Sequence, residues 1–351
     1  MIVVIADDLS GAAELAGAAV RQGLSAEVQT TFDPGTDAEV LCVDTDTRML
    51  SPVLAAERVS EVARGVVAAK PAWVFKKCDS VLRGSVLAEA RALAAVTKQA
   101  RILLAPANPS RERTISAGIY RIAGRPLHET AFAHDPLHPR RTASVKALLG
   151  EGADQISVPD ILTSADVERQ VPDADANTLP VGGLDFFTAL LTARTTAKAP
   201  PPVVPSPEAP TLVVCGSEAS WAQRCGEAAA HGIPIFSLPH DTRAVVNALG
   251  RSKPVLIGIG NGPATRESAP QVLTAKLARS VATILGQIRV ERLLLEGGAT
   301  SAAVIAGMGW TRLRAESSPA PGVGILRPTS ATAPLLAIKP GSYPWPAALW
   351  P

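Results

Sequence analysis

Short runs of apolar residues alternate with helix-length amphipathic stretches along most of the chain. This alternation is typical of parallel β-sheets that are covered by helices. In the first half the expected strands are Ile2 to Ala6, Ala26 to Thr31, Val40 to Val43, Trp73 to Lys77 and Arg101 to Ala105. In the second half they are Leu212 to Cys215, Pro234 to Leu238, Pro254 to Ile259 and Arg292 to Glu296.

Three helices are expected in the gaps between the strands of the first half. They are Gly11 to Gln22, Pro52 to Ala69 and Ser85 to Val96. Ser51 suits the N-cap of the second helix, because its hydroxyl can accept a free backbone N–H and proline is tolerated at the first helical position. The pattern of both halves predicts an α/β protein.

One proline-rich segment interrupts this pattern. Residues Ala199 to Pro210 read APPPVVPSPEAP, and so many prolines prevent a helix and favour an extended connector. We therefore expect two domains, residues 1–198 and residues 211–351, each a mainly parallel sheet flanked by helices, joined by a linker over residues 199–210. The length of 351 residues agrees with two domains at about 150 residues each.

The amino-acid composition and net charge of the chain limit which binding partners and which cellular location are expected. The formal net charge of +2 is too small to favour nucleic acid or a membrane surface as partner. The four cysteines form no C-x-x-C pair, and the first eight residues lack the basic region of a signal peptide, so a cytoplasmic location is expected. No apolar run approaches the roughly 20 residues of a membrane span. A homo-oligomer is left open, since a tail containing Trp345 and Trp350 can dock on a neighbour or on its own half.

Polar side chains follow the first strand, where an open α/β sheet binds its ligands. Asp7 and Asp8 come directly after Ala6, and Ser10 begins the next helix. A structural interpretation is that Asp8 or Ser10 caps this helix. A functional one is that a carboxylate held rigidly at a cleft acts as a general base or binds a metal ion. Two adjacent acids exceed what one cap requires.

A second polar cluster follows the third and fourth strands. It comprises Asp44 to Arg48 and Lys76 to Ser85. Charges at a buried sheet edge are costly unless they are paired, so one interpretation is an ion pair between Lys77 and Asp79. The interpretation that we favour is a basic, hydroxyl-rich pocket for a carboxylate or a phosphate, because three strand ends carry similar clusters.

Other candidate groups give weaker indications. Arg111 and Arg113 follow the fifth strand and can clamp an anion, although exposed loop arginines are common. Three histidines, His128, His134 and His138, lie close in sequence without a zinc-binding spacing, so we expect them not to bind a metal. In the second half, glycines and hydroxyls follow two strands and suit the close approach of a phosphate.

Six motifs stand in a characteristic order along the chain. They are ADDLSGAAE (Ala6 to Glu14), KKCDSVLRGS (Lys76 to Ser85), APANPSRERT (Ala105 to Thr114), GSEAS (Gly216 to Ser220), GGATSAAV (Gly297 to Val304) and KPGSY (Lys339 to Tyr343). In sequence and order they resemble the four-carbon acid sugar kinase family, and the resemblance spans essentially the whole chain. Members of that family are two-domain enzymes that use ATP to phosphorylate small sugar acids such as threonate or erythronate derivatives.

The resemblance implies a division of labour between the two halves. The N-terminal half would bind the sugar acid, with a site lined by Asp7, Asp8, Lys77, Asp79, Ser80 and Arg83. The C-terminal half would bind ATP, with Mg²⁺ as a further cofactor, near Ser217, Gly297, Gly298, Thr300 and Gly341. Asp8 would orient or deprotonate the sugar hydroxyl, Asp79 is the competing base, and Arg83 would hold the substrate carboxylate by a two-pronged contact.

The chain departs from the family pattern at two places that bear on the nucleotide. Ala299 stands where the family usually has an acid, and the terminal motif differs after Lys339. The alternative function is therefore a catalytically weak acid-binding or regulatory protein with a degenerate nucleotide site. A dehydrogenase is disfavoured, because no G-x-G-x-x-G motif with a downstream acid is present.

Overall fold

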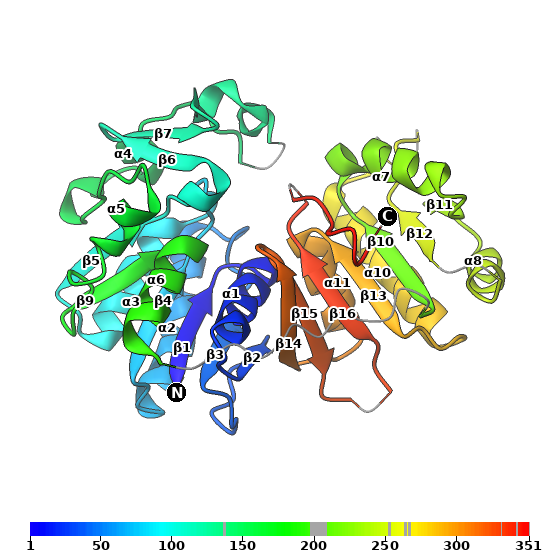
Figure 1. Ribbon diagram of the computed structural model, residues 1–351, viewed down its shortest axis with the longest axis horizontal. Coiled ribbons are helices and arrows are strands. Elements are labelled where there is room, and N and C mark those ends of the chain that lie inside the picture. Colours follow the sequence, from blue (N-terminus) through cyan, green and yellow to red (C-terminus); the bar gives the residue numbers. More distant parts are fainter. Residues whose placement is uncertain are drawn as a thin grey trace.

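The computed structural model is a large β-sheet with helices on both faces (Figure 1). It describes residues 1–135, 138–196, 209–251, 254–262, 265, 268–330, 332–341 and 343–350, with the backbone alone for 218–219. One 13-stranded sheet has the strand order β11-β12-β10-β13-β16-β15-β14-β2-β3-β1-β4-β9-β5. The α/β class that the sequence predicts is confirmed, and most neighbouring strands are parallel.

The N-terminal half supplies one block of parallel strands and the helices that cover it. Its strands are β1 (Ile2–Ala6), β2 (Ala26–Gln29), β3 (Val40–Asp44), β4 (Trp73–Lys77), β5 (Arg101–Ala105) and β9 (Thr178–Gly182). Its helices are α1 (Leu9–Arg21), α2 (Pro52–Ala68), α3 (Val86–Thr97), α4 (Val145–Leu149), α5 (Ser164–Glu168) and α6 (Leu184–Arg194). The Ser51 side chain caps α2 by accepting from the backbone N–H of Leu54, as the sequence predicts.

A small antiparallel sheet is added to this half. It consists of β6 (Arg113–Ser116), β7 (Ile119–Ile122) and β8 (Arg125–Pro126), in that order. The 3-10 turn η3 (Ala131–His134) follows it along the chain. In Figure 1 this sheet lies above the carboxyl end of the large sheet, so it can contribute side chains to a site there.

The C-terminal half supplies the other block. Its strands are β10 (Thr211–Cys215), β11 (Ile235–Ser237), β12 (Val255–Gly258), β13 (Arg292–Glu296), β14 (Arg312–Ala320), β15 (Val323–Pro328) and β16 (Leu335–Lys339). Its helices include α7 (Glu218–Ala230), α8 (Thr242–Leu249), α10 (Pro270–Leu285) and α11 (Gly298–Gly307). The expected linker lies outside the described residues, except for Ala209 and Pro210.

The two blocks join in a single sheet, because β14 pairs antiparallel with β2. Helix α1 packs over this junction against β14 and β15. The packing is close: a Cβ added at Gly324 of β15 would lie 2.7 Å from the backbone oxygen of Ala13 in α1. We expected two separate sheets and find one continuous sheet, so the division into two domains stays a prediction.

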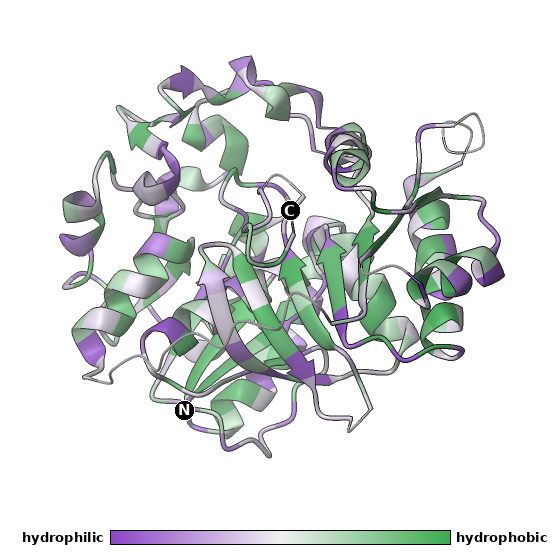
Figure 2. Cartoon of the chain, turned by 45° about the vertical axis from the view of Figure 1, so that its right-hand side comes forward, coloured by the Kyte–Doolittle hydropathy of each residue, from purple (hydrophilic) through white to green (hydrophobic). Residues whose placement is uncertain are grey.

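One hydrophobic cluster crosses the junction, with buried residues from both halves such as Val4, Leu15, Leu313 and Leu293. Figure 2 shows the strands as largely hydrophobic, while the outer faces of many helices are hydrophilic. A second cluster lies on the α7 face of the C-terminal half and includes Trp345 and Trp350. The tail therefore docks on its own half, which is one of the two arrangements that the sequence leaves open.

Candidate functional site

The first candidate site lies where the strand connections of the N-terminal half change direction. The chain leaves β1 toward β2 on one side and leaves β4 toward β5 on the other, and β1 and β4 are neighbours. Such a switch point opens a crevice beyond the carboxyl ends of the strands. Asp7, Asp8 and Asp79 follow these two strands, as the sequence predicts.

A pocket of about 40 Å³ occupies this position. We call it the junction pocket, because residues of both halves line it. They are Asp8, Ser10, Gly11, Glu14, Arg48, Lys77, Asp79, Ser80, Arg83, Arg113 and Phe132 from the N-terminal half, and Pro340 and Tyr343 from the C-terminal half. Of the predicted acid-site residues, only Asp7 does not line the pocket.

Asp8 has both a structural and a site role. Its Oδ1 accepts a hydrogen bond of 2.8 Å from the backbone N–H of Gly11, so Asp8 is the N-cap of α1. Its Oδ2 accepts from the Ser10 hydroxyl at 2.6 Å. The carboxylate is thus fixed at the start of α1 and lines the pocket; the structural interpretation, a helix cap, is confirmed, while the functional one stays a prediction.

Arg48 connects the acids of the pocket, and sequence reasoning did not single it out. Its guanidinium donates to Asp7 at 2.7 Å and grips both oxygens of Asp8 at 2.7 and 2.8 Å. It also lies 3.8 Å from Asp79. Burial raises the pKa of Asp7, but Arg48, Lys76 and Lys77 together outweigh it and lower that pKa below its usual value.

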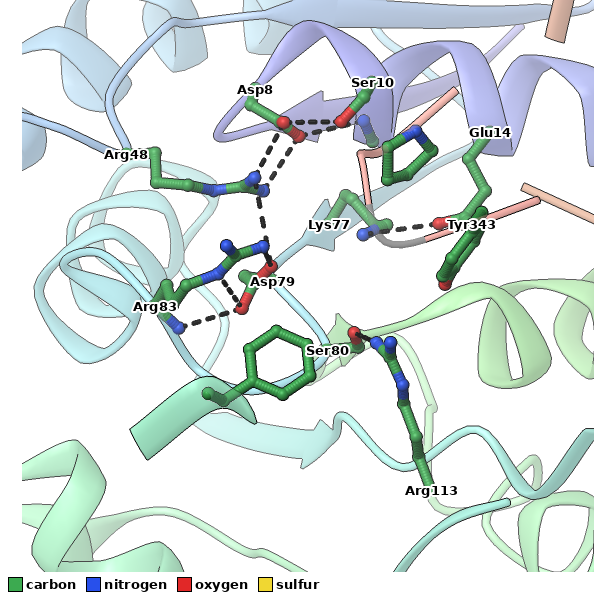
Figure 3. Close-up of a pocket in the computed structure, with 13 residues that line it drawn as sticks. Asp8, Ser10, Glu14, Arg48, Lys77, Asp79, Ser80, Arg83, Arg113 and Tyr343 are labelled. Atoms are coloured by element: carbon green, nitrogen blue, oxygen red, sulfur yellow. Dashed lines mark hydrogen bonds and ion pairs between the residues drawn. The ribbon is translucent and has the colours of Figure 1, made fainter. Parts of the chain in front are cut away.

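The Arg83 guanidinium is paired with Asp79, which lies four residues before it in the loop after β4. Its Nε and one terminal nitrogen donate to the two Asp79 oxygens at 3.0 and 2.8 Å, and the other terminal nitrogen donates to Asp135 at 3.1 Å. Burial opposes ionisation, yet Arg83 and Arg48 hold the pKa of Asp79 well below its usual range. The two-pronged contact of Arg83, predicted for a substrate carboxylate, is made to Asp79 in this structure (Figure 3).

The two lysines of β4 have partners on opposite faces of the sheet. Lys77 lies 3.5 Å from Glu14 of α1, and Lys76 pairs with Glu89 of α3 at 2.7 Å. The proposed Lys77–Asp79 ion pair was therefore the wrong pairing, because Asp79 turns toward Arg83 and Arg48. The opposite orientation of the lysines follows the alternation expected of a strand.

Arg113 is the exception among the pocket cations. Its guanidinium donates to the Ser80 hydroxyl and lies 5.7 Å from the Phe132 ring and 5.6 Å from the Tyr343 ring. Within the described residues, no carboxylate lies within ion-pair distance of it, although the residue is only 8% exposed. A buried cation without a counter-charge favours an anionic ligand beside it.

The second candidate site lies at the corresponding switch point of the C-terminal half. There β10 and β13 are neighbours, and the chain continues from β10 toward β11 but from β13 toward β16. The glycines and hydroxyls predicted to bind nucleotide follow these strands and β16. Gly341 packs against Ser217, since an added Cβ would lie 3.2 Å from the Ser217 hydroxyl, and Gly216 packs against Thr300.

The two sites meet at Gly297 and Gly298, which we call the GG loop. Gly297 has φ +101°, which favours glycine, and no side chain caps α11 after it. An added Cβ at Gly298 would lie 2.5 Å from Asp8 Oδ2 and 3.2 Å from Ser10 Oγ. The first turn of α11, whose amides no side chain caps, therefore begins in contact with the acid that caps α1, and free helix amides can bind a phosphate group beside this contact.

Among the described residues, no group of three or more His, Cys, Asp or Glu could hold a metal ion by itself. In the same part of the chain, no helix is long and apolar enough to cross a membrane.

Comparison with known proteins identifies relatives that are similar to this chain in sequence. A family model described as a sugar-binding N-terminal domain matches residues 2–179. A D-threonate kinase of Bordetella bronchiseptica is 30% identical over 66% of this chain and 71% of its own length. A 3-oxo-tetronate kinase of Cupriavidus necator is 27% identical over 97% of this chain and 94% of its own.

Solved structures share the fold. A crystal structure from Salmonella typhimurium LT2 has a TM-score of 0.72 and 20% identity, and covers 98% of this chain and 96% of its own. A Haemophilus influenzae protein has a TM-score of 0.69 and 19% identity, with 97% of both chains covered. The likeness extends over both blocks of the sheet.

Proposed function

Because the chain belongs to the four-carbon acid sugar kinase family, we propose that it is an ATP-dependent kinase that phosphorylates a hydroxyl of a sugar acid of about four carbons. The observation that carries this proposal is the approach of the GG loop to Asp8. Phosphoryl transfer depends on holding the acceptor hydroxyl in line with the transferred phosphate. The junction pocket, where the sugar acid would bind, adjoins the free amides of α11, so the acceptor hydroxyl and the transferred phosphate can be held next to each other.

The proposed substrate carboxylate binds at Arg113. This guanidinium is the buried pocket cation without a carboxylate partner among the described residues, and Ser80 adds a hydroxyl beside it. Arginine binds a carboxylate through two parallel hydrogen bonds, which fixes the orientation of the acid. Arg83 then acts by holding Asp79, so the carboxylate contact moves from Arg83, as the sequence predicted, to Arg113.

Asp8 is the residue that we propose to orient the reacting hydroxyl and receive its proton. Arg48 grips both oxygens of Asp8, as Arg83 grips those of Asp79, but Asp8 lies against the GG loop, and the pKa of Asp79 is held well below its usual range. A carboxylate with so low a pKa is a weak base. Asp8 therefore fits the role better than its competitor Asp79.

The nucleotide phosphates are proposed to lie along Ser217, Gly341 and the GG loop. These segments are packed together, and two of them are helix starts whose amides can bind phosphate oxygens. Mg²⁺, when bound, would neutralise phosphate charge, and it commonly uses only one or two protein carboxylates together with phosphate and water. Arg48 grips both oxygens of Asp8 and Ala299 supplies no acid, so such an ion would rest mainly on the phosphates and water, with the Asp8 carboxylate beside them.

The experiment is the Asp8→Asn substitution, read by ADP release and by calorimetric binding. Asparagine can still accept the helix-capping hydrogen bond from Gly11, so the fold should persist. We expect kcat to fall by about 10²–10⁴ while ATP affinity changes little. The exposed Asp173→Asn variant is the control and should keep wild-type turnover.

Near-normal turnover of Asp8→Asn would remove Asp8 from the proposed role. A wild-type chain that binds the sugar acids yet releases no ADP would instead favour the alternative of a catalytically weak acid-binding protein.

A further inference from the structure

The proposed phosphoryl transfer makes no use of one charged pair in the junction pocket. Glu14 of α1 and Lys77 of β4 both line the pocket, and they are only 7% and 4% exposed. The Glu14 Oε2 and Lys77 Nζ atoms lie 3.5 Å apart, which is long for a hydrogen bond between charged groups. The two side chains attract each other but are not tied together by a hydrogen bond.

The carboxylate of Glu14 has unused capacity to accept hydrogen bonds. Among the described residues it accepts none, and Lys77 is its one ion-pair partner there. The other acids of the pocket differ, because arginines donate to both oxygens of Asp8 and to both oxygens of Asp79. A buried carboxylate whose oxygens lack donors favours a ligand that donates to it.

Lys77 supplies donors at the same place. One N–H of its ammonium donates to the Cys78 carbonyl at 2.9 Å, and this is the one hydrogen bond that the ammonium makes within the described residues. Burial opposes its charge, but Glu14, Asp7 and Asp8 raise the pKa of Lys77 above its usual value, so the ammonium keeps its proton. The pair thus offers an acceptor and a donor side by side.

The pair lies between the two ends proposed for the sugar acid, and close to Asp8. A Cβ added at Gly11, on the same face of α1 as Glu14, would lie 2.9 Å from Asp8 Oδ1 and 3.3 Å from Lys77 Nζ. In Figure 3, Lys77 and Glu14 lie between Asp8 and Arg113. An acid whose carboxylate binds Arg113 and whose reacting hydroxyl meets Asp8 therefore brings the carbon next to the reacting one to this pair.

We propose that Glu14 and Lys77 select an acid with a hydroxyl, and not a keto group, on this carbon, which is carbon 3 when a four-carbon acid spans the pocket. The inference rests on the proposed function and adds to it the class of acid, a polyhydroxy acid. A hydroxyl donates to Glu14 and accepts from Lys77, so it satisfies both groups. A keto oxygen only accepts, so it leaves Glu14 unpaired and sets its negative end against the carboxylate.

The test compares acids that differ at this carbon, by calorimetric binding to the wild-type chain and by ADP release. D-threonate or D-erythronate should bind about 10- to 100-fold more tightly than 3-oxo-tetronate, because the keto acid leaves a buried carboxylate without its donor. The same loss is expected for 2,4-dihydroxybutanoate, which lacks the hydroxyl on carbon 3. Its isomer 3,4-dihydroxybutanoate keeps that hydroxyl and should lose less affinity.

The Glu14→Gln substitution separates recognition from packing. Glutamine has nearly the same shape, but its amide can donate to a keto oxygen. Affinity for the hydroxy acids should fall about tenfold, while that for 3-oxo-tetronate stays within twofold of wild type or rises. ATP affinity should not change, which shows that the variant is folded. Glu61→Gln, on an exposed face of α2, is the matched control and should change none of these affinities.

Equal affinity of the wild-type chain for the hydroxy acids and for 3-oxo-tetronate would overturn the proposal, and this result does not depend on the folding of any variant. A folded Glu14→Gln variant that weakens every acid by the same factor would also overturn it, since a merely structural role has that effect. Selective binding of the hydroxy acids without formation of a phosphate ester would contradict the kinase function alone, so the two failures are distinguishable. Binding of none of the acids would contradict both.

Discussion

At the scale of single residues, the site is organised by the pairing of charges. Arg48 neutralises Asp7 and Asp8, Arg83 neutralises Asp79, and Lys77 faces Glu14. In each pair, the attraction between the two charges offsets the free energy cost of burying them. A cation paired in this way has few free N–H groups to donate to a ligand. Arg113 differs, because its neighbours are a hydroxyl and two aromatic rings.

Arg113→Gln should therefore weaken binding of the sugar acid and leave binding of ATP unchanged. Loss of a charge-assisted hydrogen bond costs about 1.5–3 kcal/mol, so KM for the acid should rise about 10- to 100-fold while KM for ATP stays near wild type. Arg125→Gln, on the exposed end of the same small sheet, is the control. An equal rise in both KM values would place Arg113 outside the acid site.

Asp44, at the end of β3, makes the stability of the protein depend on pH. Burial raises its pKa well above the usual value, and the charges of Asp8, Asp46 and Asp7 raise it further against one backbone hydrogen bond from Asp46. The folded protein keeps this proton at pH values where the unfolded chain has lost it, so stability falls as pH rises above the unfolded pKa of about 4.

Asp44→Asn should remove this loss, because the amide is neutral and its oxygen can still accept from Asp46. Urea unfolding should show no gain near pH 4 and a growing gain in the free energy of unfolding toward pH 7. The exposed Asp37→Asn variant should show no such growth. A gain that does not grow between pH 4 and pH 7 would contradict the raised pKa of Asp44.

At the scale of elements, the segment after β16 serves both sites. Gly341 packs against Ser217 in the proposed nucleotide-binding region, while Pro340 and Tyr343 line the junction pocket. Tyr343 lies over Arg111 at 4.3 Å and near Arg113 at 5.6 Å. Since the pocket of about 40 Å³ is smaller than small-molecule sites of about 300–1,000 Å³, we expect this segment to shift when a four-carbon acid enters.

Tyr343→Ala should weaken acid binding about tenfold, because it removes ring contacts to two arginines and leaves the pocket open to water. It should also abolish any gain in acid affinity that ATP produces. Tyr343→Phe keeps the ring and is expected to behave as wild type. Calorimetric titrations with and without ATP measure both effects, and an unchanged ATP-dependent gain in Tyr343→Ala would show that the segment does not couple the sites.

The elements also show what the sequence could and could not predict. Strands β1, β4, β5 and β13 have the predicted bounds, because continuous apolar runs mark strands that are buried on both faces. Strand β9 was missed in a polar, weakly periodic segment, although it lies between β4 and β5. Such a position depends on distant partners, which no local pattern reports.

The same limit applies within the site. The sequence predicts that Asp8, Lys77, Asp79 and the GG loop lie at strand ends, because each directly follows an apolar run. It does not predict which cation pairs with which acid. Arg48 and Arg83 pair with the carboxylates through contacts between separate loops. Only the folded chain therefore shows that Arg113 donates to Ser80 and has no carboxylate partner among the described residues.

At the scale of the whole molecule, the two halves face each other because they share one sheet. The pairing of β2 with β14 joins the two blocks, and α1 crosses the junction (Figure 1). Because α1 packs against β14, β15 and α11, Asp8 at its start lies against Gly298. The acid pocket and the proposed phosphate loops thus form one site at the border of the halves. Under the proposed function, each half binds one reactant and the phosphoryl group is transferred between them.

The most direct test of this claim is phosphorus NMR of the full chain incubated with ATP, Mg²⁺ and D-threonate, D-erythronate or 3-oxo-tetronate. We expect at least one acid to yield a phosphate monoester signal in a one-to-one ratio with ADP, and the ester to form about 10²–10⁴ times more slowly with Asp8→Asn. Consumption of ATP without an ester, or no reaction with any of the three acids while ATP and acid both bind, would contradict it.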